Sequence, residues 1–555
     1  MSRRIAHLIL ASFAFAGCAS QRQAPAVEVA SRGPYVTLAG APRADAPRVD
    51  APRTDPPGSI NADELRRDLY VFASDSFRGR ETGTADARRA AAFLARRVQL
   101  LGLEPAGDSM YMQRVPLMRE TFASDTRFVV SDEGRSTALS LGVDIAPVTS
   151  FGEELPEPRR DARGEIVFVG YGTTSAGSDA PITDDLEGKV VVMIHGAPRG
   201  TKPELKKQLE SQQALGERLG QLLPYRPAAI VLLMTGGAEE FYRQILPELM
   251  RGVVPVSERS TAPDSLRSFP MVLFGIARPH SPLLPGGWPN DARPQSLGRE
   301  LNAHVELRRE PFTAYNVVAV VRGRDPQLNT TYLAYGAHYD HLGIMHPDAS
   351  RAATVTDSIA NGADDDGSGS VALLAIARRM TMVRPKRSVL FVWHVAEEKG
   401  LLGSAYFTAH ATVPIDSIVA QFNADMIGRN APDMLHLVGP RAAPNYQSWR
   451  LGMIVDSVNR AYDKPLRINR QLDDPDHPEQ IYRRSDHYNY AKRGIPIIFF
   501  TTGLHEDYHK VSDEASKIDY RKMSRIAQLM LDAGLAVANR ETRPIAQGIA
   551  KAIAP

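Results

Sequence analysis

Cysteine is nearly absent from this chain, since Cys18 is the only one among 555 residues. A single cysteine cannot form a disulfide within the chain, so the stability of the fold must come from packing. An excess of one charge is also lacking, because 66 Lys and Arg residues balance 64 Asp and Glu residues. This balance gives no global field that would attract nucleic acid, and we expect no nucleic-acid partner. Specific chemistry must therefore come from a local site.

Long hydrophobic runs are lacking as well, and no stretch after residue 59 is apolar enough for a transmembrane helix. Residues 1–17 predict a signal peptide, with two arginines before a short apolar stretch. The setting of Cys18, FAGC, resembles the bacterial lipobox, whose cysteine is lipidated. Residues 18–59, rich in Ala, Pro, Arg and Asp, predict a disordered tether. We expect a lipoprotein of the bacterial cell envelope that faces the periplasm from the outer membrane and touches the membrane only through its lipid. The alternative is an ordinary secreted protein.

The remainder of the chain divides into three regions with different patterns of apolar residues. Residues 60–118 carry apolar residues at spacings of three and four, which predicts amphipathic helices. Residues 119–311 hold short β-rich runs punctuated by Gly and Pro, with one helical stretch at 202–222. Residues 312–545 alternate apolar strand-like runs with helix-like ones, which predicts a sheet covered on both faces. The expected fold is therefore α/β, a mostly parallel mixed sheet flanked by helices, with a β-rich insert.

Potentially reactive side chains stand where the strand-like runs of the last region end. These are His338, the pair Glu397 and Glu398, Asp425, and the segment after Thr502. Open α/β sheets bind ligands at the carboxyl ends of their strands, so we expect these loops to meet in one crevice.

The residue types in these loops indicate a metal site. In GAHYDHLG, Asp340 follows His338 at a spacing that lets a carboxylate orient a ligating imidazole. The run of three aspartates at 364–366 lies just before a predicted helix. In the Glu397–Glu398 pair, one carboxylate can bind a cation while the other accepts a proton from water. Carboxylate and imidazole without thiolate favour zinc or a similar divalent ion.

Five motifs then carry a specific resemblance. GAHYDHLG, NGADDDGSGS, AEEKGLLGS, NADMIG and DYHKVSDE, in this order, resemble the metal-binding motifs of metallopeptidase family twenty-eight, which includes zinc aminopeptidases and glutamate carboxypeptidases. The resemblance covers about 60–118 and 312–540. The run EIVFVGYGTTSAGSD and the segment after it resemble a protease-associated domain inserted over 119–311. Such inserts are noncatalytic and cover the cleft or help to select substrates.

The resemblance implies a zinc-peptidase fold that holds two Zn²⁺ ions per chain, with Co²⁺ or Mn²⁺ as substitutes. Asp365, three positions before Ser368, would bridge the two ions. His338 and Asp425 would complete one metal, and Glu398 and His509 the other.

The same resemblance implies roles for the residues around the metals. Glu397 would be the general base, and Asp340 would support His338. His509 is favoured over His505 because the family's ligand histidine stands four residues before an acidic residue. Tyr508 could stabilise an oxyanion or simply pack. His487, in a Ser-Asp-His stretch, would line the cleft or fix a loop.

The implied function is a dinuclear zinc exopeptidase, an aminopeptidase that cuts N-terminal residues from peptides. A carboxypeptidase for acidic C-terminal residues would need arginines aimed at the substrate, and Arg429, Arg483 and Arg484 are candidates. A glutaminyl cyclase would use one zinc, which the full ligand set disfavours. A noncatalytic binding protein on the same fold is the remaining alternative.

Overall fold

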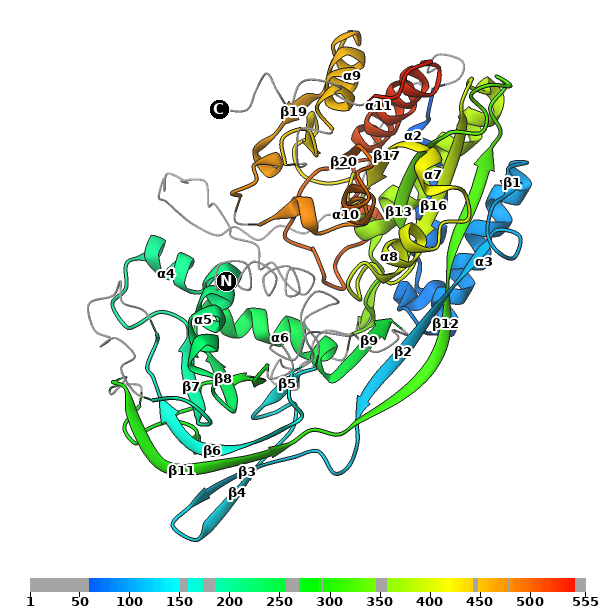
Figure 1. The fold of residues 1–555 in the computed structure, drawn as a ribbon. Coiled ribbons are helices and arrows are strands. Elements are labelled where there is room, and N and C mark those ends of the chain that lie inside the picture. Colours follow the sequence, from blue (N-terminus) through cyan, green and yellow to red (C-terminus); the bar gives the residue numbers. More distant parts are fainter. Residues whose placement is uncertain are drawn as a thin grey trace, which may run out of the picture.

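The computed structural model describes residues 59–544 except 150–157, 173–184, 256–268, 289, 291–292, 346–356, 443–447 and 478. The expected signal peptide, Cys18 and the tether up to residue 58 lie outside the described residues. Of the helices that are described, none combines the length and the apolar character needed to cross a membrane. Two sheets organise this part of the chain, one with ten strands and one with eight (Figure 1).

Parallel strands form the centre of the ten-stranded sheet, in the order β16 (Ser388–His394), β13 (Tyr332–His338), β17 (Ile418–Ala424) and β20 (Ile497–Thr501), with β13 between β16 and β17. Every residue of these strands is buried. Continuous apolar runs are typical of strands covered on both faces. The expected α/β fold with a sheet flanked by helices is confirmed.

Antiparallel strands extend the sheet on both sides and make it mixed. Beyond β16 lie β12 (Leu307–Val321), β2 (Met112–Phe122) and β9 (Arg251–Pro255), while β1 (Glu104–Pro105) pairs with β12. Beyond β20 lie the antiparallel β18 (Met434–Val438) and then β19 (Arg467–Asn469).

Alternating side chains of the central strands pack against helices on opposite faces. Leu333 and Tyr335 belong to a core shared with α2 (Ala62–Phe72), α3 (Ala85–Leu100), α7 (Gly369–Val383), α9 (Trp449–Arg460) and α11 (Tyr520–Ala538). Tyr332 and Ala334 belong to the core on the other face, with α8 (Leu402–Ala409) and α10 (His487–Lys492). This division follows from the two-residue period of a strand.

The eight-stranded sheet, called the inserted sheet below, is built from residues 127–304, which lie within the range predicted as an insert. Its order is β4 (Arg135–Leu139), β3 (Arg127–Asp132), β11 (Gln295–His304), β6 (Asp161–Phe168), β7 (Val190–His195), β8 (Ala229–Met234), β10 (Met271–Ile276) and β5 (Ala146–Val148). The strands β6, β7, β8 and β10 run parallel. The helices α4 (Pro203–Leu209) and α5 (Gln212–Leu222) lie between β7 and β8 in the chain, and α6 (Gly237–Met250) follows β8. The stretch at 202–222 is helical as expected, whereas α6 was not predicted; it buries Ala238 and Tyr242 against the sheet.

Two long strands run from one sheet to the other. β2 and β12 pair along Met112–Phe122 and Leu307–Val317, so the expected boundaries at 119 and 311 fall inside them. The insert leaves the ladder at Ala123, whose N–H donates to the carbonyl of Glu306 at 2.8 Å. The strand β9 then returns from the end of α6 to pair with β2 (Figure 1).

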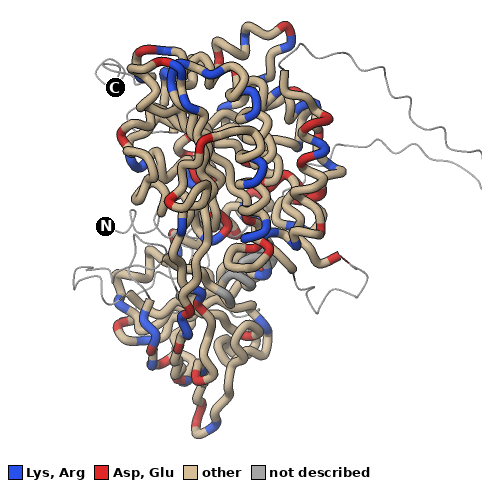
Figure 2. The backbone as a smooth tube through the Cα atoms, turned by 90° about the vertical axis from the view of Figure 1, so that its right-hand side faces the viewer, with Lys and Arg blue, Asp and Glu red and all other residues tan. Residues whose placement is uncertain are grey.

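Shorter elements complete the described fold. They are η1 (Asp75–Arg80), η2 (Leu223–Tyr225), β14 (Gly343–Ile344), β15 (Ile359–Ala360), η4 (Ala363–Ser368), η5 (Ile415–Ser417), η7 (Gln471–Asp473), η8 (Ile481–Arg483) and η9 (Ala515–Lys517). Acidic and basic positions are interspersed along both parts of the chain (Figure 2). This mixing agrees with the balanced composition.

Candidate metal centre

His338 stands at the end of β13 and faces three carboxylates. Its Nε2 lies 3.1 Å from Asp365 Oδ1, 3.7 Å from Asp425 Oδ1 and 3.9 Å from Glu397 Oε2. Its Nδ1 lies 3.2 Å from the carbonyl oxygen of Asp340 and 3.9 Å from that residue's carboxylate. The backbone carbonyl, rather than the predicted carboxylate, is therefore the closer partner that orients this imidazole.

The three consecutive aspartates have different roles. Asp365 points its carboxylate at two predicted ligands, with Oδ1 toward His338 and Oδ2 3.2 Å from His509 Nε2. Asp366 accepts the N–H of His338 at 3.1 Å and that of Gly369 at 2.8 Å. Asp364 accepts the N–H of Gly428 at 2.6 Å. The outer two aspartates thus fix the loop while the central one faces the site.

Asp513 holds the aspartate loop from the other side. Its carboxylate accepts the N–H groups of Asp364 at 2.9 Å and Asp365 at 3.1 Å. It follows His509 by four residues, the spacing that favoured His509 in the sequence. His505 instead places Nε2 3.3 Å from Asp364 Oδ2, away from the carboxylate of Asp365 that faces the imidazoles.

The two glutamates after β16 diverge. Glu398 places Oε2 3.1 Å from His509 Nε2 and Oε1 2.6 Å from His341 Nδ1. Glu397 turns toward His338, and its backbone N–H donates to Asp340 Oδ1 at 3.1 Å. One carboxylate of the pair therefore joins a histidine cluster, and the other stands at the edge of the site.

The described residues form two adjoining groups that could hold a cation, and Asp365 belongs to both. The first consists of His338, Asp365 and Asp425, all buried. The second contains Asp365 and Glu398, with His341 close enough to contribute Nδ1. His509 directs Nε2 at both of these carboxylates, whereas His341 Nδ1 is 3.8 Å from Asp365 and hydrogen-bonded to Glu398. His509 is therefore closer than His341 to the carboxylate of Asp365, and its role as the ligand stays a prediction.

The atoms that face one another fit a divalent cation. His338 Nε2 and Asp365 Oδ2 are buried and lack a well-aligned hydrogen-bond partner. Burial alone would lower the pKa of His509, but Glu398 and Asp365 raise it to about 10. Burial opposes ionisation of Glu398, yet His509 and His341 lower its pKa to about 2. Imidazoles and carboxylates held in this way are the N and O donors that zinc prefers, and the imidazoles give up their protons when metal binds.

Glu397 has the electrostatics of a proton-transfer group. Burial, with help from the carboxylates of Glu398 and Asp425, raises its pKa well above the usual range, although His338 opposes the shift. A carboxylate with a raised pKa can take up a proton and later release it near neutral pH.

A pocket adjoins the carboxylates of Asp365, Glu397 and Asp425. Its other residues are mostly apolar, with Tyr508, Arg484 and Thr501 as the polar exceptions, and the rest are Met426, Leu472, Ile481, Phe499, Gly503 and Leu504. Arg484 directs Nη2 toward the Tyr508 hydroxyl at 3.5 Å, and the Tyr508 ring stacks on His509 with 3.8 Å between centroids. This pocket can take an apolar side chain next to the metal-ligating groups.

His487 does not reach this pocket, so the prediction that it lines the cleft is wrong. Its ring is fully buried and stacks on Phe499, with 4.5 Å between centroids. Its Nε2 donates to the carbonyl of Tyr482 at 2.8 Å. His487 therefore fixes the segment behind the pocket wall, the other role open to it.

Of the three arginines proposed for substrate recognition, Arg484 alone lines the pocket. It pairs with Glu479 at 3.0 Å. Arg429 pairs through Nη2 with Asp507 at 2.6 Å, while its Nη1 is buried and lacks a hydrogen-bond partner among the described residues.

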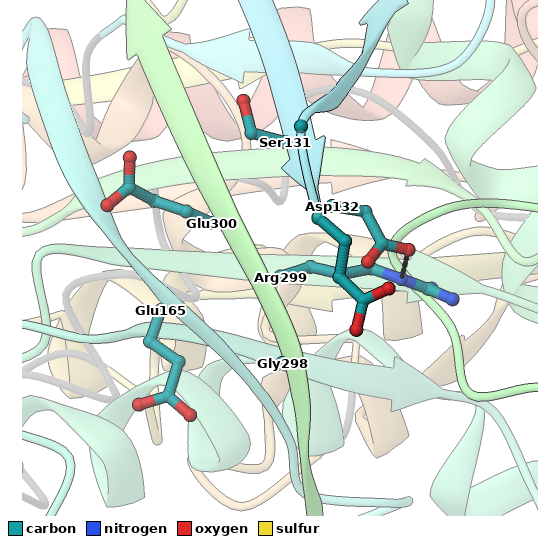
Figure 3. Close-up of a pocket in the computed structure, with 8 residues that line it drawn as sticks. Ser131, Asp132, Glu165, Gly298, Arg299 and Glu300 are labelled. Atoms are coloured by element: carbon teal, nitrogen blue, oxygen red, sulfur yellow. Dashed lines mark hydrogen bonds and ion pairs between the residues drawn. The ribbon is translucent and has the colours of Figure 1, made fainter.

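A second pocket lies on the inserted sheet and has a different character (Figure 3). It is lined by acidic side chains, of which Asp132 pairs with Arg299 at 3.1 Å. Glu165 and Glu300 also have basic partners, Lys189 at 3.6 Å and Arg163 at 2.7 Å. Paired, exposed charges of this kind are typical of a solvated surface.

Three residues near the metal centre were missed in the sequence. His341 lies three residues after His338 in the same motif, and that spacing could have identified it. Arg80 and Thr82 belong to the N-terminal region and carry no local signal. Only the fold brings them to the loops after β13.

Comparison with known proteins agrees with this geometry. Residues 316–534 match the model described as Peptidase family M28. A probable leucine aminopeptidase 2 from Aspergillus oryzae is 31% identical over 212 residues, which are 36% of this chain and 36% of the relative. Leucine aminopeptidase 1 from Trichophyton rubrum is 28% identical over 242 residues, 41% of this chain and 59% of the relative. The chain thus matches between about a third and three fifths of the length of these relatives.

Among solved structures, the aminopeptidase from Aneurinibacillus sp. strain AM-1 is 16% identical and superposes with a TM-score of 0.52. The match covers 88% of this chain and 96% of that one. This likeness shows a shared fold.

Proposed function

We propose that this protein is a dinuclear zinc aminopeptidase that removes N-terminal residues from peptides. The observation that carries the proposal is the position of Asp365, whose two carboxylate oxygens face His338 on one side and His509 on the other. Asp425 would complete the first metal position and Glu398 the second. The match of residues 316–534 to an M28 peptidase model supports a metallopeptidase.

Two divalent cations at these positions would supply Lewis-acid polarisation of the scissile carbonyl and of a water molecule. A side chain of the protein would transfer the proton of the attacking water. Glu397, at the edge of the site with a raised pKa, would accept the proton of the attacking water and deliver it to the leaving amine. The contact between its N–H and Asp340 holds the loop in place for this transfer.

The pocket supports an exopeptidase for apolar residues. Its carboxylates would attract a substrate amine, and its apolar residues would receive the adjacent side chain. The Tyr508 hydroxyl would donate a hydrogen bond to the developing oxyanion, with Arg484 beside it.

A carboxypeptidase is the second candidate, because Arg484 places a guanidinium in the same pocket. The apolar lining is a poor match for acidic side chains, so we place this candidate second.

The test combines metal content with substrate panels on the purified full-length chain. We expect about two zinc ions per chain and turnover of leucyl- and phenylalanyl-nitroanilides. Turnover of N-blocked peptides ending in glutamate, without nitroanilide turnover, would favour the carboxypeptidase. If the chain binds no metal, the zinc peptidase proposal is wrong, and a noncatalytic binding protein on the same fold is favoured.

A further inference from the structure

Arg80 is fully buried at the end of η1, between α2 and α3 and outside the segment that matches the peptidase family. Its guanidinium donates only to backbone carbonyls in the described structure. Nε donates to Tyr339 at 2.7 Å, Nη1 to Asn361 at 2.7 Å and Phe72 at 3.2 Å, and Nη2 to Gly362 at 2.9 Å. Four hydrogen bonds on one rigid, planar group define its position tightly.

Three of the four acceptors belong to the two loops that carry the expected metal ligands, and the fourth, Phe72, ends α2. Tyr339 directly follows His338, and Gly362 precedes Asp365 in the aspartate loop. One guanidinium therefore sets the separation between the loop of His338 and the loop of Asp365. A change at Arg80 would be transmitted to both.

The turn around Arg80 is pressed against the same loops. Gly79 has φ +70°, and a Cβ added there would lie 2.5 Å from the carbonyl oxygen of Ala360 and 2.6 Å from that of Gly343. Glu81 forms an isolated bridge with His341. The turn at residues 79–81 therefore packs directly against the loop after β13 and the segment before the aspartate loop.

Charge gives Arg80 a second effect. Burial lowers its pKa to about 10, while Asp340, Asp513, Asp365 and Asp366 favour its charged form. No carboxylate of the described residues lies within ion-pair distance of it. Its positive charge therefore acts on the group of carboxylates as a whole and offsets part of their mutual repulsion.

Thr82, two residues on, reaches the general base through one intermediate. Its hydroxyl donates to Asp340 Oδ2 at 2.8 Å, and Asp340 Oδ1 accepts the N–H of Glu397 at 3.1 Å. Asp340 therefore has one oxygen held by Thr82 and the other held by the backbone of Glu397.

We propose that Arg80 and Thr82 are positioning residues of the metal centre. Arg80 fixes the two ligand-bearing loops and thereby sets zinc affinity, and Thr82 holds Glu397 in place through Asp340. This inference rests on the proposed zinc peptidase function.

The first test measures zinc affinity of the full-length chain by competition with a chromogenic chelator. Arg80→Lys keeps the charge but loses the planar fork, and we expect zinc to bind roughly 10- to 100-fold more weakly, as for other groups that support metal ligands. Arg78→Lys is the matched control, because Arg78 lies in the same turn, is half exposed and, among the described residues, forms an ion pair with Asp86 alone, at 3.6 Å. It should bind zinc as the unsubstituted chain does.

The second test uses Thr82 and does not depend on the folding of an Arg80 variant. Thr82→Val keeps the shape and removes the hydroxyl, so we expect kcat to fall roughly tenfold with KM and zinc content unchanged. Thr82→Ser restores the hydroxyl and should recover most of kcat. A merely structural role would lower thermal stability in both variants without this division between kcat and KM.

The outcomes separate the two proposals. If the unsubstituted chain binds no zinc, the proposed function fails and this inference fails with it. If it binds zinc and Arg80→Lys binds equally well while Thr82→Val keeps full kcat, the inference alone is overturned.

Discussion

The two sheets of this protein share a parallel α/β centre and differ in what stands at the ends of its strands. In the ten-stranded sheet, β13 ends at His338, Glu397 and Glu398 follow β16, and Asp425 follows β17. In the eight-stranded sheet, β6 ends at Phe168, β8 at Met234 and β10 at Ile276, and His195 ends β7. The same architecture thus carries buried carboxylates and imidazoles at its strand ends in one case and mostly apolar residues in the other.

His195 shows this difference most clearly. It is fully buried, and its Nδ1 contacts Nη1 of Arg218, which also donates to the carbonyl of Leu209 at 2.9 Å. Burial and the neighbouring Arg218 hold the pKa of His195 well below its ordinary value. His338 and His509 are buried as well, but carboxylates raise their pKa values. A strand-end histidine becomes a candidate ligand only where carboxylates converge on it.

The largest expected effect comes from Glu397→Gln. Loss of the proton acceptor should lower kcat by roughly 10²- to 10⁴-fold, the usual contribution of general acid–base catalysis, with zinc content retained. Glu165→Gln in the acidic pocket of the inserted sheet is the matched control and should change kcat less than about twofold. Initial rates on leucyl-nitroanilide and metal analysis check both. Equal losses in the two variants would remove the distinction between the sheets.

Removal of metal should destabilise the loops of the ten-stranded sheet and leave the eight-stranded sheet unchanged. A ligand present at 1,000 times its Kd stabilises the folded state by about 4 kcal/mol, so chelation should destabilise the site by a comparable amount. Hydrogen exchange should increase in the loops after β13 and β16 and in residues 361–369, and stay unchanged in β7 and β8. Uniform changes over both sheets would contradict the placement of the metals.

Tyr508→Phe tests the pocket next to the metal centre. Loss of one hydroxyl donor to an oxyanion should lower kcat about 10²-fold, equivalent to about 2.7 kcal/mol, with little change in KM. Tyr482→Phe is the control, because the Tyr482 hydroxyl is buried without a hydrogen-bond partner in the described structure. Steady-state kinetics of both variants decide the point, and unchanged kcat in Tyr508→Phe would leave Tyr508 a packing residue.

The smallest effect concerns pH and the inserted sheet. Because the folded-state pKa of His195 is lowered, the unfolded chain takes up a proton below about pH 6.5 that the folded chain does not. Stability from neutral His195 is therefore complete above that pH and is lost as pH falls, by about 1.4 kcal/mol per pH unit at most. Hydrogen-exchange protection of β7 and β8 measured between pH 7.5 and 5.5 should fall accordingly. His195→Asn, which keeps an acceptor for Arg218, should flatten this slope, and an unchanged slope would contradict the assignment.

The features that short stretches of sequence determine could be predicted, and the central strands are the clearest case. The continuous apolar runs of β13, β16, β17 and β20 can be buried only in a sheet covered on both faces, and their ends then converge. Asp365 lies between two imidazoles, and the set of ligands implied by the five motifs stays a prediction.

Residues whose roles depend on distant contacts could not be predicted. Arg80 and Thr82 reach residues more than 250 positions away, and no periodicity encodes such a contact. His487 has the same residue type as a ligand, but its burial behind Phe499 depends on the packing of α10. The strand β9 lies in residues expected to belong wholly to the insert, and its partner β2 is 130 residues earlier in the chain.

That strand has a mechanical consequence. A link made of β2 and β12 alone would be a two-stranded ribbon, and such ribbons twist and bend readily. However, β9, which follows α6, pairs with β2 over Leu117 to Thr121, on the edge of β2 opposite to β12. The connection between the two sheets therefore has three strands, β9, β2 and β12, and is stiffer than a two-stranded ribbon. We expect a rotation of the inserted sheet to move the edge of the ten-stranded sheet with it, because the connection bends little.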